Sequence, residues 1–114
     1  MHERNVILTW EAIYDIVNII EHIEITFGIN RANRFQKDIR FQMKNLEIVG
    51  GIFGKTDIYY RNYSIYKMPF PPSIIFYIIK EPQKEIHVLR VLREEQDWKT
   101  KLTEKQSYTY PNLI

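Results

Sequence analysis

The sequence predicts an α+β domain in which a hairpin of two helices packs on one face of a mainly antiparallel four-stranded sheet. Residues 10–27 and 31–49 repeat apolar side chains at three- and four-residue spacing, the period of an amphipathic helix. Residues 74–79 and 86–92 lack that period and are rich in β-branched side chains, which is typical of buried strands. The expected order of elements is β-α-α-β-β-β, followed by a short helix.

The first predicted strand covers residues 4–8 and ends at Thr9. Threonine is a favourable helix N-cap, and the acidic side chains that follow it suit the positive end of the helix dipole. We therefore expect the first helix to run from Trp10 to Phe27, with Gly28 as its C-terminal stop.

The second predicted helix is capped by Asn30 and ends before the Gly50-Gly51 pair. Since so few residues separate the two helices, they must lie antiparallel. Their charges are segregated, because the first helix has acidic side chains and no Lys or Arg, whereas the second is mainly basic. Opposite charges are expected to face each other across the seam. A basic helix that grips phosphates is the functional alternative to a solvated face.

Three strands are expected to follow as a meander. Residues 53–68 alternate aromatic and polar side chains, which predicts one strand with one wet face. The proline-rich stretch 68–72 should end it, because proline lacks the backbone donor that a ladder needs. The central strand, 74–79, is apolar on both faces, and the polar connection 81–84 leads to the last strand, 85–93.

The C-terminal part is predicted to begin with a short helix, capped by Asp97 and ending near Leu102. Within it, Trp98 lies four residues before Leu102, and the two side chains should pin the helix to the sheet. The following SYTYPNLI segment, residues 107–114, has no periodicity, so a loose tail and a docked segment are both open alternatives.

Chain length and composition limit the number of domains and the location that we expect for the protein. At 114 residues the chain can bury a single core, and we assign residues 1–102 to one domain and residues 103–114 to a C-terminal tail. The sheet face opposite the helices is expected to be open to function. The longest apolar run is six residues, and no leader-like pattern opens the chain. We therefore expect no membrane association and a cytoplasmic location.

Several classes of site are excluded by residue types and spacing. Without any Cys, the chain has no disulfide framework, thiolate nucleophile or thiolate metal site. His2, His22 and His87 share no ligand spacing, so we expect neither a metal nor a cofactor. Gly-rich phosphate loops, nucleophile elbows and zinc-peptidase helices are also missing from the sequence.

The most informative charges are arginines in or near apolar strands. Arg90 and Arg93 belong to so apolar a strand that each guanidinium needs a partner or solvent. In a regular strand they lie on opposite faces, Arg90 with Ile86, Val88 and Leu92, and Arg93 with His87, Leu89 and Val91. A snorkelling or carboxylate-paired role is expected for Arg90, and binding or catalysis is the functional alternative for Arg93 and His87. Arg61, among tyrosines, could stack on a ring for structure or for RNA.

Four segments carry a resemblance to a known family, and they read ILTWEAIYDIVNIIEHI, RANRFQKDI, SIIFYII and EIHVLRVLREEQDW. The helix start LT-x-x-A-x-x-D (Leu8, Thr9, Ala12, Asp15) and the strand VLRVL (Val88 to Leu92) are fairly specific together. From about Val6 to Trp98 the sequence resembles the RelE/ParE family of bacterial toxins from type II toxin–antitoxin modules. This resemblance implies a plasmid-stabilisation type toxin that inhibits growth and is held in check by a cognate antitoxin, usually encoded beside it.

The resemblance also bears on the target. RelE-like members cleave mRNA on the ribosome without metal, using basic residues at strand positions that fall here near Ser64, Tyr66, Ile74 and Glu94, none of which is basic. Cleavage needs cations where charge develops on the phosphate. ParE-like members, which poison DNA gyrase by binding, lack that cluster. The first hypothesis is therefore a non-enzymatic, ParE-like binder of DNA gyrase, whose candidate contacts to its target or to nucleic acid are Lys55, Lys67, Arg90, Arg93 and Trp98.

Two alternatives remain open. The first is a RelE-like, ribosome-dependent and metal-independent mRNA endoribonuclease, with Arg61, His87 and Arg93 as catalytic candidates and Lys55 or Lys67 as phosphate contacts. The second is a degenerate toxin that acts only as an antitoxin-binding module.

Overall fold

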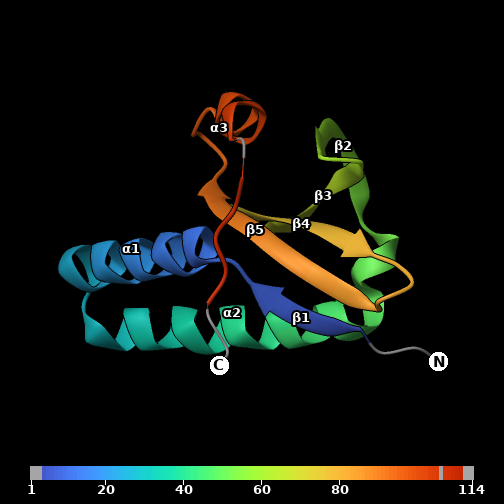
Figure 1. Cartoon of the computed structure of the whole chain (residues 1–114). Coiled ribbons are helices and arrows are strands. Elements are labelled where there is room, and N and C mark those ends of the chain that lie inside the picture. The colour runs from blue at the N-terminus through green and yellow to red at the C-terminus, as the bar shows by residue number, and fades with distance from the viewer. Residues whose placement is uncertain (1–3, 106, 112–114) are drawn as a thin grey trace.

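The computed structural model describes residues 4–105 and 107–111, and it confirms the α+β class (Figure 1). The elements in chain order are β1 (Asn5–Leu8), α1 (Trp10–Phe27), α2 (Ile29–Val49), the 3-10 turn η1 (Gly50–Ile52), β2 (Gly54–Tyr60), β3 (Tyr63–Phe70), β4 (Ser73–Lys80), β5 (Glu85–Arg93) and α3 (Trp98–Glu104). The outer ends of the predicted domain and tail, residues 1–3 and 112–114, lie outside the described residues.

The sheet has five strands in the order β1-β5-β4-β3-β2, with β1 parallel to β5 and the other pairs antiparallel. The expected count of four is wrong because residues 53–68 form a hairpin instead of one strand. Tyr60 pairs with Tyr63, so Arg61 and Asn62 make the turn, and Arg61 adopts a left-handed φ of 56°. Glycine usually occupies such a turn position. Because residues 61 and 62 include no glycine, the sequence carries no sign that residues 53–68 form two strands joined by a turn.

The end expected for this strand at Met68 is also wrong, since β3 continues through Pro69 to Phe70. Pro69 pairs with Ile74 of β4, whereas the pairing with β2 reaches only to Lys67. At Pro69 the strand therefore has a neighbour on one side only, which is where a sheet tolerates a residue without a backbone donor.

The helix hairpin forms as predicted, with one shift at its turn. Thr9 caps α1 by accepting a hydrogen bond from the Ala12 N–H at 3.0 Å, and Gly28 ends α1 with a φ of 99°. The predicted Asn30 cap is wrong, because α2 already begins at Ile29. Gly28 alone reverses the chain, using a backbone conformation that other residues rarely adopt. Figure 1 shows the two helices antiparallel and side by side.

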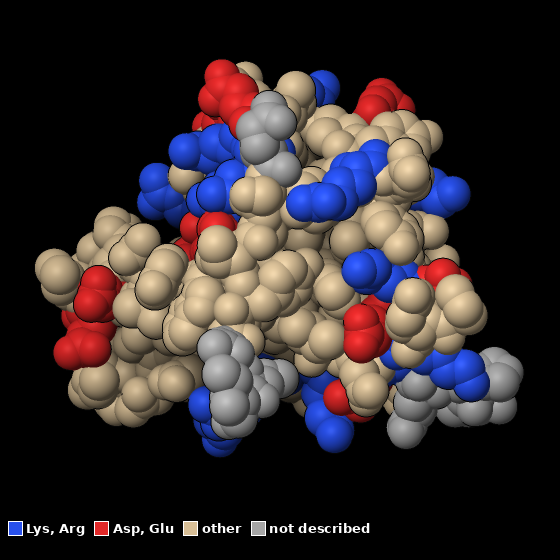
Figure 2. Space-filling model, in the orientation of Figure 1, with Lys and Arg blue, Asp and Glu red and all other residues tan. Residues whose placement is uncertain are grey.

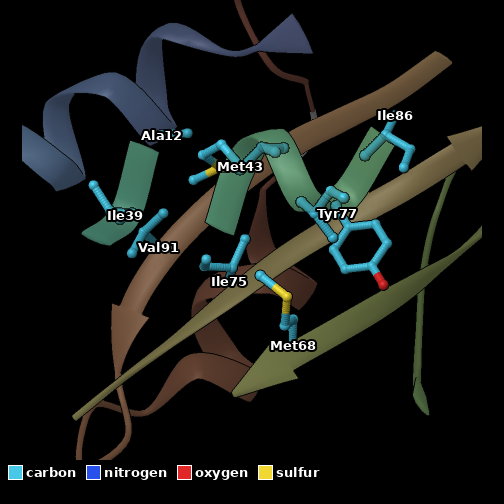
Figure 3. Close-up of a cluster of buried hydrophobic side chains, with 10 residues drawn as sticks. Ala12, Ile39, Met43, Met68, Ile75, Tyr77, Ile86 and Val91 are labelled. Carbon is cyan, nitrogen blue, oxygen red and sulfur yellow. The ribbon is translucent and has the colours of Figure 1, made fainter. Parts of the chain in front are cut away.

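The helices cover one sheet face and bury the main core there (Figure 3). Residues from both helices and from three strands meet in it, namely Ala12, Ile39, Met43, Leu46, Met68, Ile75, Tyr77, Ile86, Val88 and Val91. Burying each large side chain of this kind contributes about 1.5–3 kcal/mol. At one end Tyr77 donates a hydrogen bond to the Gly50 carbonyl, which ties the end of α2 to the centre of the sheet.

The opposite sheet face is covered, which corrects the expectation that it is open. A second cluster of Ile65, Phe76, Ile78, Leu89, Leu92, Leu102 and Tyr108 is buried there. Trp98 packs its ring on Phe76, with 5.1 Å between the centroids, and Leu102 is buried, so α3 is pinned as predicted. Of the two alternatives for the C-terminal segment, the docked one is observed for its described residues. Figure 1 shows this segment running across β5 towards the helices.

Strand β5 contains a bulge that changes which side chains share a face. Phe76 pairs with Arg90, but the next residue, Tyr77, pairs with Val88, so Leu89 is the extra residue on β5. After a bulge the alternation of faces is shifted by one. Ile86 and Val88 therefore lie in the helix-side core whereas Leu92 lies in the second cluster. The grouping predicted for a regular strand, Arg90 with Ile86, Val88 and Leu92, is wrong for this reason.

Candidate functional site

The LT-x-x-A-x-x-D motif fastens the start of α1 to β5. Thr9 donates its hydroxyl to the carbonyls of Val88 and Leu89, at 3.1 and 3.0 Å, and also caps the helix. Ala12 is completely buried where the helix meets the sheet. The motif and the VLRVL strand are thus two halves of one structural joint.

Asp15 completes this joint by binding Arg90. The carboxylate accepts hydrogen bonds from Arg90 Nε at 2.7 Å, from Arg90 Nη2 at 2.9 Å and from the Val91 N–H at 2.9 Å. The hydrogen bond with Asp15 raises the pKa of Arg90 above its ordinary value, against the effect of burial. The carboxylate-paired role expected for Arg90 is the one observed.

Arg93 lies apart from Arg61 and His87. Its Nε contacts Glu95 Oε1 at 3.0 Å, and its side chain lines a hollow of about 250 Å³ beside α1. The same hollow is lined by Asp15, Asn18 and His22. Arg93 therefore faces an acidic and amide-rich surface on the helix side of the sheet.

Arg61 and His87 do come together, in a tyrosine-rich hollow of about 220 Å³ on the other side. Its other lining residues are Tyr60, Tyr63, Ile78, Lys80, Tyr108 and Tyr110. His87 is only 7% exposed, and both ring nitrogens are engaged, one by Glu85 at 2.9 Å and the other by the Tyr110 hydroxyl at 2.6 Å. Arg61 lies over the Tyr60 ring, at 5.2 Å from its centroid. The predicted ring stacking of Arg61 is thereby confirmed.

The C-terminal segment forms one wall of this hollow and is held by polar contacts. Glu11 accepts hydrogen bonds from the Thr109 N–H at 3.0 Å and from the Thr109 hydroxyl at 3.1 Å, and Lys105 lies 3.3 Å away. Burial alone would raise the pKa of Glu11, but these hydrogen bonds outweigh it and lower the pKa below 4.5. Burial raises the pKa of Tyr110 to about 12, so its hydroxyl stays protonated at neutral pH.

Three of the predicted contact residues meet in another place, which we call the lysine hollow. Lys55 of β2, Lys67 of β3, and Trp98 and Lys99 at the start of α3 line a cavity of about 260 Å³, together with Thr56, Asp57 and Ile58. The β2 backbone bulges between Lys55 and Tyr59, and the Thr56 hydroxyl fixes the bulge by donating to the Ile65 carbonyl at 2.8 Å. The hollow thus joins the edge strand β2 and its neighbour β3 to a short helix.

An apolar groove of about 320 Å³ follows the seam between α1 and α2. Its lining is Leu8, Ile13, Ile16, Val17, Ile20, Gln36, Ile39, Arg40 and Met43. Although both helices are fully described, none of their ion pairs joins α1 to α2, so the expected pairing across the seam is wrong. Figure 2 shows acidic side chains at the α1 end and basic ones along the lower edge, over α2. The residues that line the groove are apolar apart from Gln36 and Arg40.

Two other features bear on the class of site. Within residues 4–105 and 107–111, no three His, Asp or Glu side chains converge in a way that could hold a metal ion. None of the helices described is both long enough and apolar enough to cross a membrane.

Sequence reasoning found Lys55, Lys67 and Trp98, but it missed the residues that complete each hollow. Lys99 directly follows Trp98, and that adjacency at a helix start was a usable signal. Lys80 and Tyr110 carried no comparable signal, because their meeting with His87 depends on how the C-terminal segment docks.

Comparisons with known proteins agree with this geometry. Residues 6–98 match the family described as the ParE toxin of type II toxin-antitoxin system, parDE. The structure is similar to a chain of the chromosomal ParDE TA system from P. aeruginosa, with a TM-score of 0.69 and 23% sequence identity. That match covers 83% of the present chain and 100% of the other. A comparison with curated protein sequences gave no match.

Proposed function

The chain belongs to the ParE toxin family of type II toxin–antitoxin systems, and from this premise we propose that it acts by binding a target protein such as DNA gyrase and is neutralised by a cognate antitoxin. The observation that carries the choice of binding over RNA cleavage is the separation of the catalytic candidates. Arg61 and His87 line one hollow, whereas Arg93 lines another, beside α1. Phosphoryl transfer needs its cations and its proton-transfer group around a single phosphate.

The state of His87 supports the same choice. A general base must reach the proton that it removes, yet His87 is 93% buried and its two ring nitrogens already contact Glu85 and Tyr110. Arg90, a further cation of β5, is held by Asp15.

We test this proposal by adding purified toxin to a gyrase supercoiling reaction and, in parallel, to ribosomes translating a defined mRNA. The expected result is inhibition of supercoiling at micromolar toxin, with unchanged mRNA by primer extension. Intact supercoiling together with new mRNA ends would contradict the proposal. Such an outcome would favour the second candidate, a metal-independent endoribonuclease, for which the observation is that Arg61 and His87 share one hollow.

The endoribonuclease has its own diagnostic variants. Arg61→Ala and His87→Gln should each abolish mRNA cleavage if these residues perform it. For a gyrase binder, Arg61→Ala should leave mRNA intact, as in the native toxin. Arg34→Ala, which removes an exposed guanidinium from α2, is the matched control.

For the antitoxin, the apolar groove along the α1–α2 seam is the proposed binding surface. An amphipathic helix binds such a groove through apolar side chains on one of its faces. Arg40, the one charged residue among the described residues that line the groove, would favour an acidic side chain on the flank of that helix. Unlike the buried core, this groove keeps apolar side chains in solvent, and Val17 is 45% exposed.

The groove is tested with a matched pair of substitutions, Val17→Asp and Phe41→Asp. Both place a carboxylate at an exposed apolar position, but only Val17 lines the groove. We expect Val17→Asp to weaken binding of the product of the adjacent short reading frame by at least about tenfold, because it buries an unpaired charge. Phe41→Asp should bind as the native chain does. Equal binding by both variants would show that the antitoxin binds another surface of the toxin.

A further inference from the structure

We propose that the lysine hollow is a docking site for the sugar-phosphate backbone of duplex DNA. Its lining includes three lysines from three elements, Lys55, Lys67 and Lys99. The ammonium groups of Lys67 and Lys99 lie beside the Trp98 ring, whereas that of Lys55 lies beside the Tyr66 ring, across the edge of the sheet. All three residues are exposed. This surface would let the toxin contact DNA directly, in addition to its proposed protein target.

The residues that line the hollow carry a net positive charge. Asp57 is the one carboxylate in the lining, against three lysines, and across the described residues no ion pair within 4.0 Å involves any of the four. Lys67 and Lys99 lie beside the same aromatic ring, and an anion beside two like charges reduces the repulsion between them. The geometry therefore favours an anionic ligand.

The aromatic rings beside the lysines already pack against other rings of the protein. The hollow is therefore better suited to bind the phosphates of a nucleic acid than its bases. Lys67 Nζ and Lys99 Nζ lie 5.4 and 5.6 Å from the centroid of the Trp98 ring, and that ring packs on Phe76. Lys55 Nζ lies 5.8 Å from the Tyr66 ring, which stacks on Tyr77. Single strands are bound by stacking their bases on free aromatic rings, whereas a duplex keeps its bases stacked inside and presents its phosphates on the outside. Binding should therefore be independent of sequence.

The residues that line the hollow also favour a nucleic acid over an acidic peptide as the ligand. Protein interfaces are anchored by apolar or aromatic side chains in their centre. In the lysine hollow the apolar side chains are Ile58 and Trp98, and both are already partly buried against the second cluster. The choice of DNA over RNA rests on the proposed function, since an enzyme that works on DNA would bring a duplex close to the bound toxin.

The experiment compares two triple variants that remove the same charge. The cluster variant carries Lys55→Gln, Lys67→Gln and Lys99→Gln, and the control carries Arg34→Gln, Lys37→Gln and Lys44→Gln on exposed positions of α2. Circular dichroism and thermal melting establish that both variants are folded. Fluorescence anisotropy then measures binding of the full chain to a labelled duplex of about 20 base pairs at salt concentrations from about 50 to 200 mM.

We expect the native chain to bind the duplex with an affinity that falls steeply with salt. The cluster variant should bind roughly ten- to a hundredfold more weakly at low salt, and the slope of log affinity against log salt should be smaller by about 2–3, since each phosphate contact contributes about 0.9. The control should retain most of the native slope. Two duplexes of unrelated sequence should bind equally well.

Four outcomes would overturn the proposal: no duplex binding by the native chain at low salt, equal losses in both variants, tighter binding of an RNA duplex, or displacement of DNA by an equal charge of polyglutamate. Gyrase inhibition by the same proteins keeps this proposal separate from the proposed function. Inhibition of gyrase without any DNA binding would disprove the DNA-binding proposal alone. DNA binding without inhibition of gyrase would disprove gyrase as the target and leave the DNA-binding proposal in place.

Discussion

The two faces of the sheet are covered in different ways. On one face, two long helices bury a continuous apolar core that includes Leu46, Ile75 and Val88. On the other, a helix of seven residues and a short C-terminal segment cover the sheet, and polar contacts such as Glu11 with Thr109 fasten that segment. The helix side resists change mainly through packing, and the second side through a smaller apolar cluster together with a few hydrogen bonds. Both the lysine hollow and the tyrosine-rich hollow lie at the second side.

The difference shows where function can be placed in a domain of this size. A packed core loses stability with every change of volume, so it leaves little freedom to the side chains in it. A face covered by short segments has hollows at its rim, where charged side chains can gather without disturbing the core. Four substitutions test this comparison.

The largest effect is expected from Leu46→Ala, on the helix side. Leu46 is completely buried, so the substitution should lower the free energy of unfolding by about 3–4 kcal/mol through lost burial and a new cavity. Urea denaturation measures the change. Phe41→Ala, at a position of the same helix that is 68% exposed, should cost less than about 0.5 kcal/mol. Similar losses for the two variants would contradict the packing account.

Asp15→Ala should cost about 3 kcal/mol, because it leaves the largely buried Arg90 guanidinium and the Val91 N–H without their partner. Asp15→Asn should cost less, since the amide oxygen can still accept from Val91. Urea denaturation of both variants checks this order. A loss below about 1 kcal/mol for Asp15→Ala would show that water replaces the carboxylate there.

A smaller and pH-dependent effect is expected for Glu11→Gln, on the second side. The pKa of Glu11 is lowered in the folded state, so its carboxylate stabilises the fold above the ordinary value of 4.5. This contribution is lost as the pH falls through the lowered pKa. We expect a deficit of about 1 kcal/mol at neutral pH, which should shrink as the pH falls below 4.5 and disappear below the lowered pKa. Thermal unfolding across that range measures it, and a deficit independent of pH would exclude the charge as its source.

The smallest effect, of opposite sign, is expected for Tyr108→Phe. The Tyr108 hydroxyl is buried and has no hydrogen-bond partner among the described residues. Removing it should leave stability unchanged or raise it by up to about 1 kcal/mol. Tyr110→Phe is the control, because it removes a hydroxyl that contacts His87 and should cost about 1 kcal/mol. Equal destabilisation by both would imply that Tyr108 has a polar partner after all.

The sequence was sufficient to predict the elements that packing dictates. Both long helices, the central strand and the Asp97 cap followed from periodicity and capping rules. The failures occurred where a backbone feature left no mark in residue type. Arg61 turns the chain in a conformation that usually belongs to glycine, and Leu89 bulges without a Gly or Pro nearby.

The candidate site was predictable in part, for a similar reason. Lys55, Lys67 and Trp98 were chosen for their residue types, and the fold brings them together. Their proximity depends on the docking of α3, which local patterns do not encode. The neighbours of Arg90 and Arg93 could not be predicted without knowledge of the bulge. In a regular strand Arg90 would share a face with Ile86 and Val88, and the bulge at Leu89 shifts that alternation by one residue.

The joint made by Thr9 and Asp15 has a consequence for the behaviour of the protein in a crowded solution. Strand β1 pairs with β5 only from Glu85 to Val88, so beyond Val88 the outer side of β5 would present free backbone groups to other chains. Thr9 occupies the carbonyls of Val88 and Leu89, and Asp15 occupies the Val91 N–H. An uncovered strand edge is a template for strand addition and aggregation. The residues that anchor the first helix therefore also block strand addition along this part of β5.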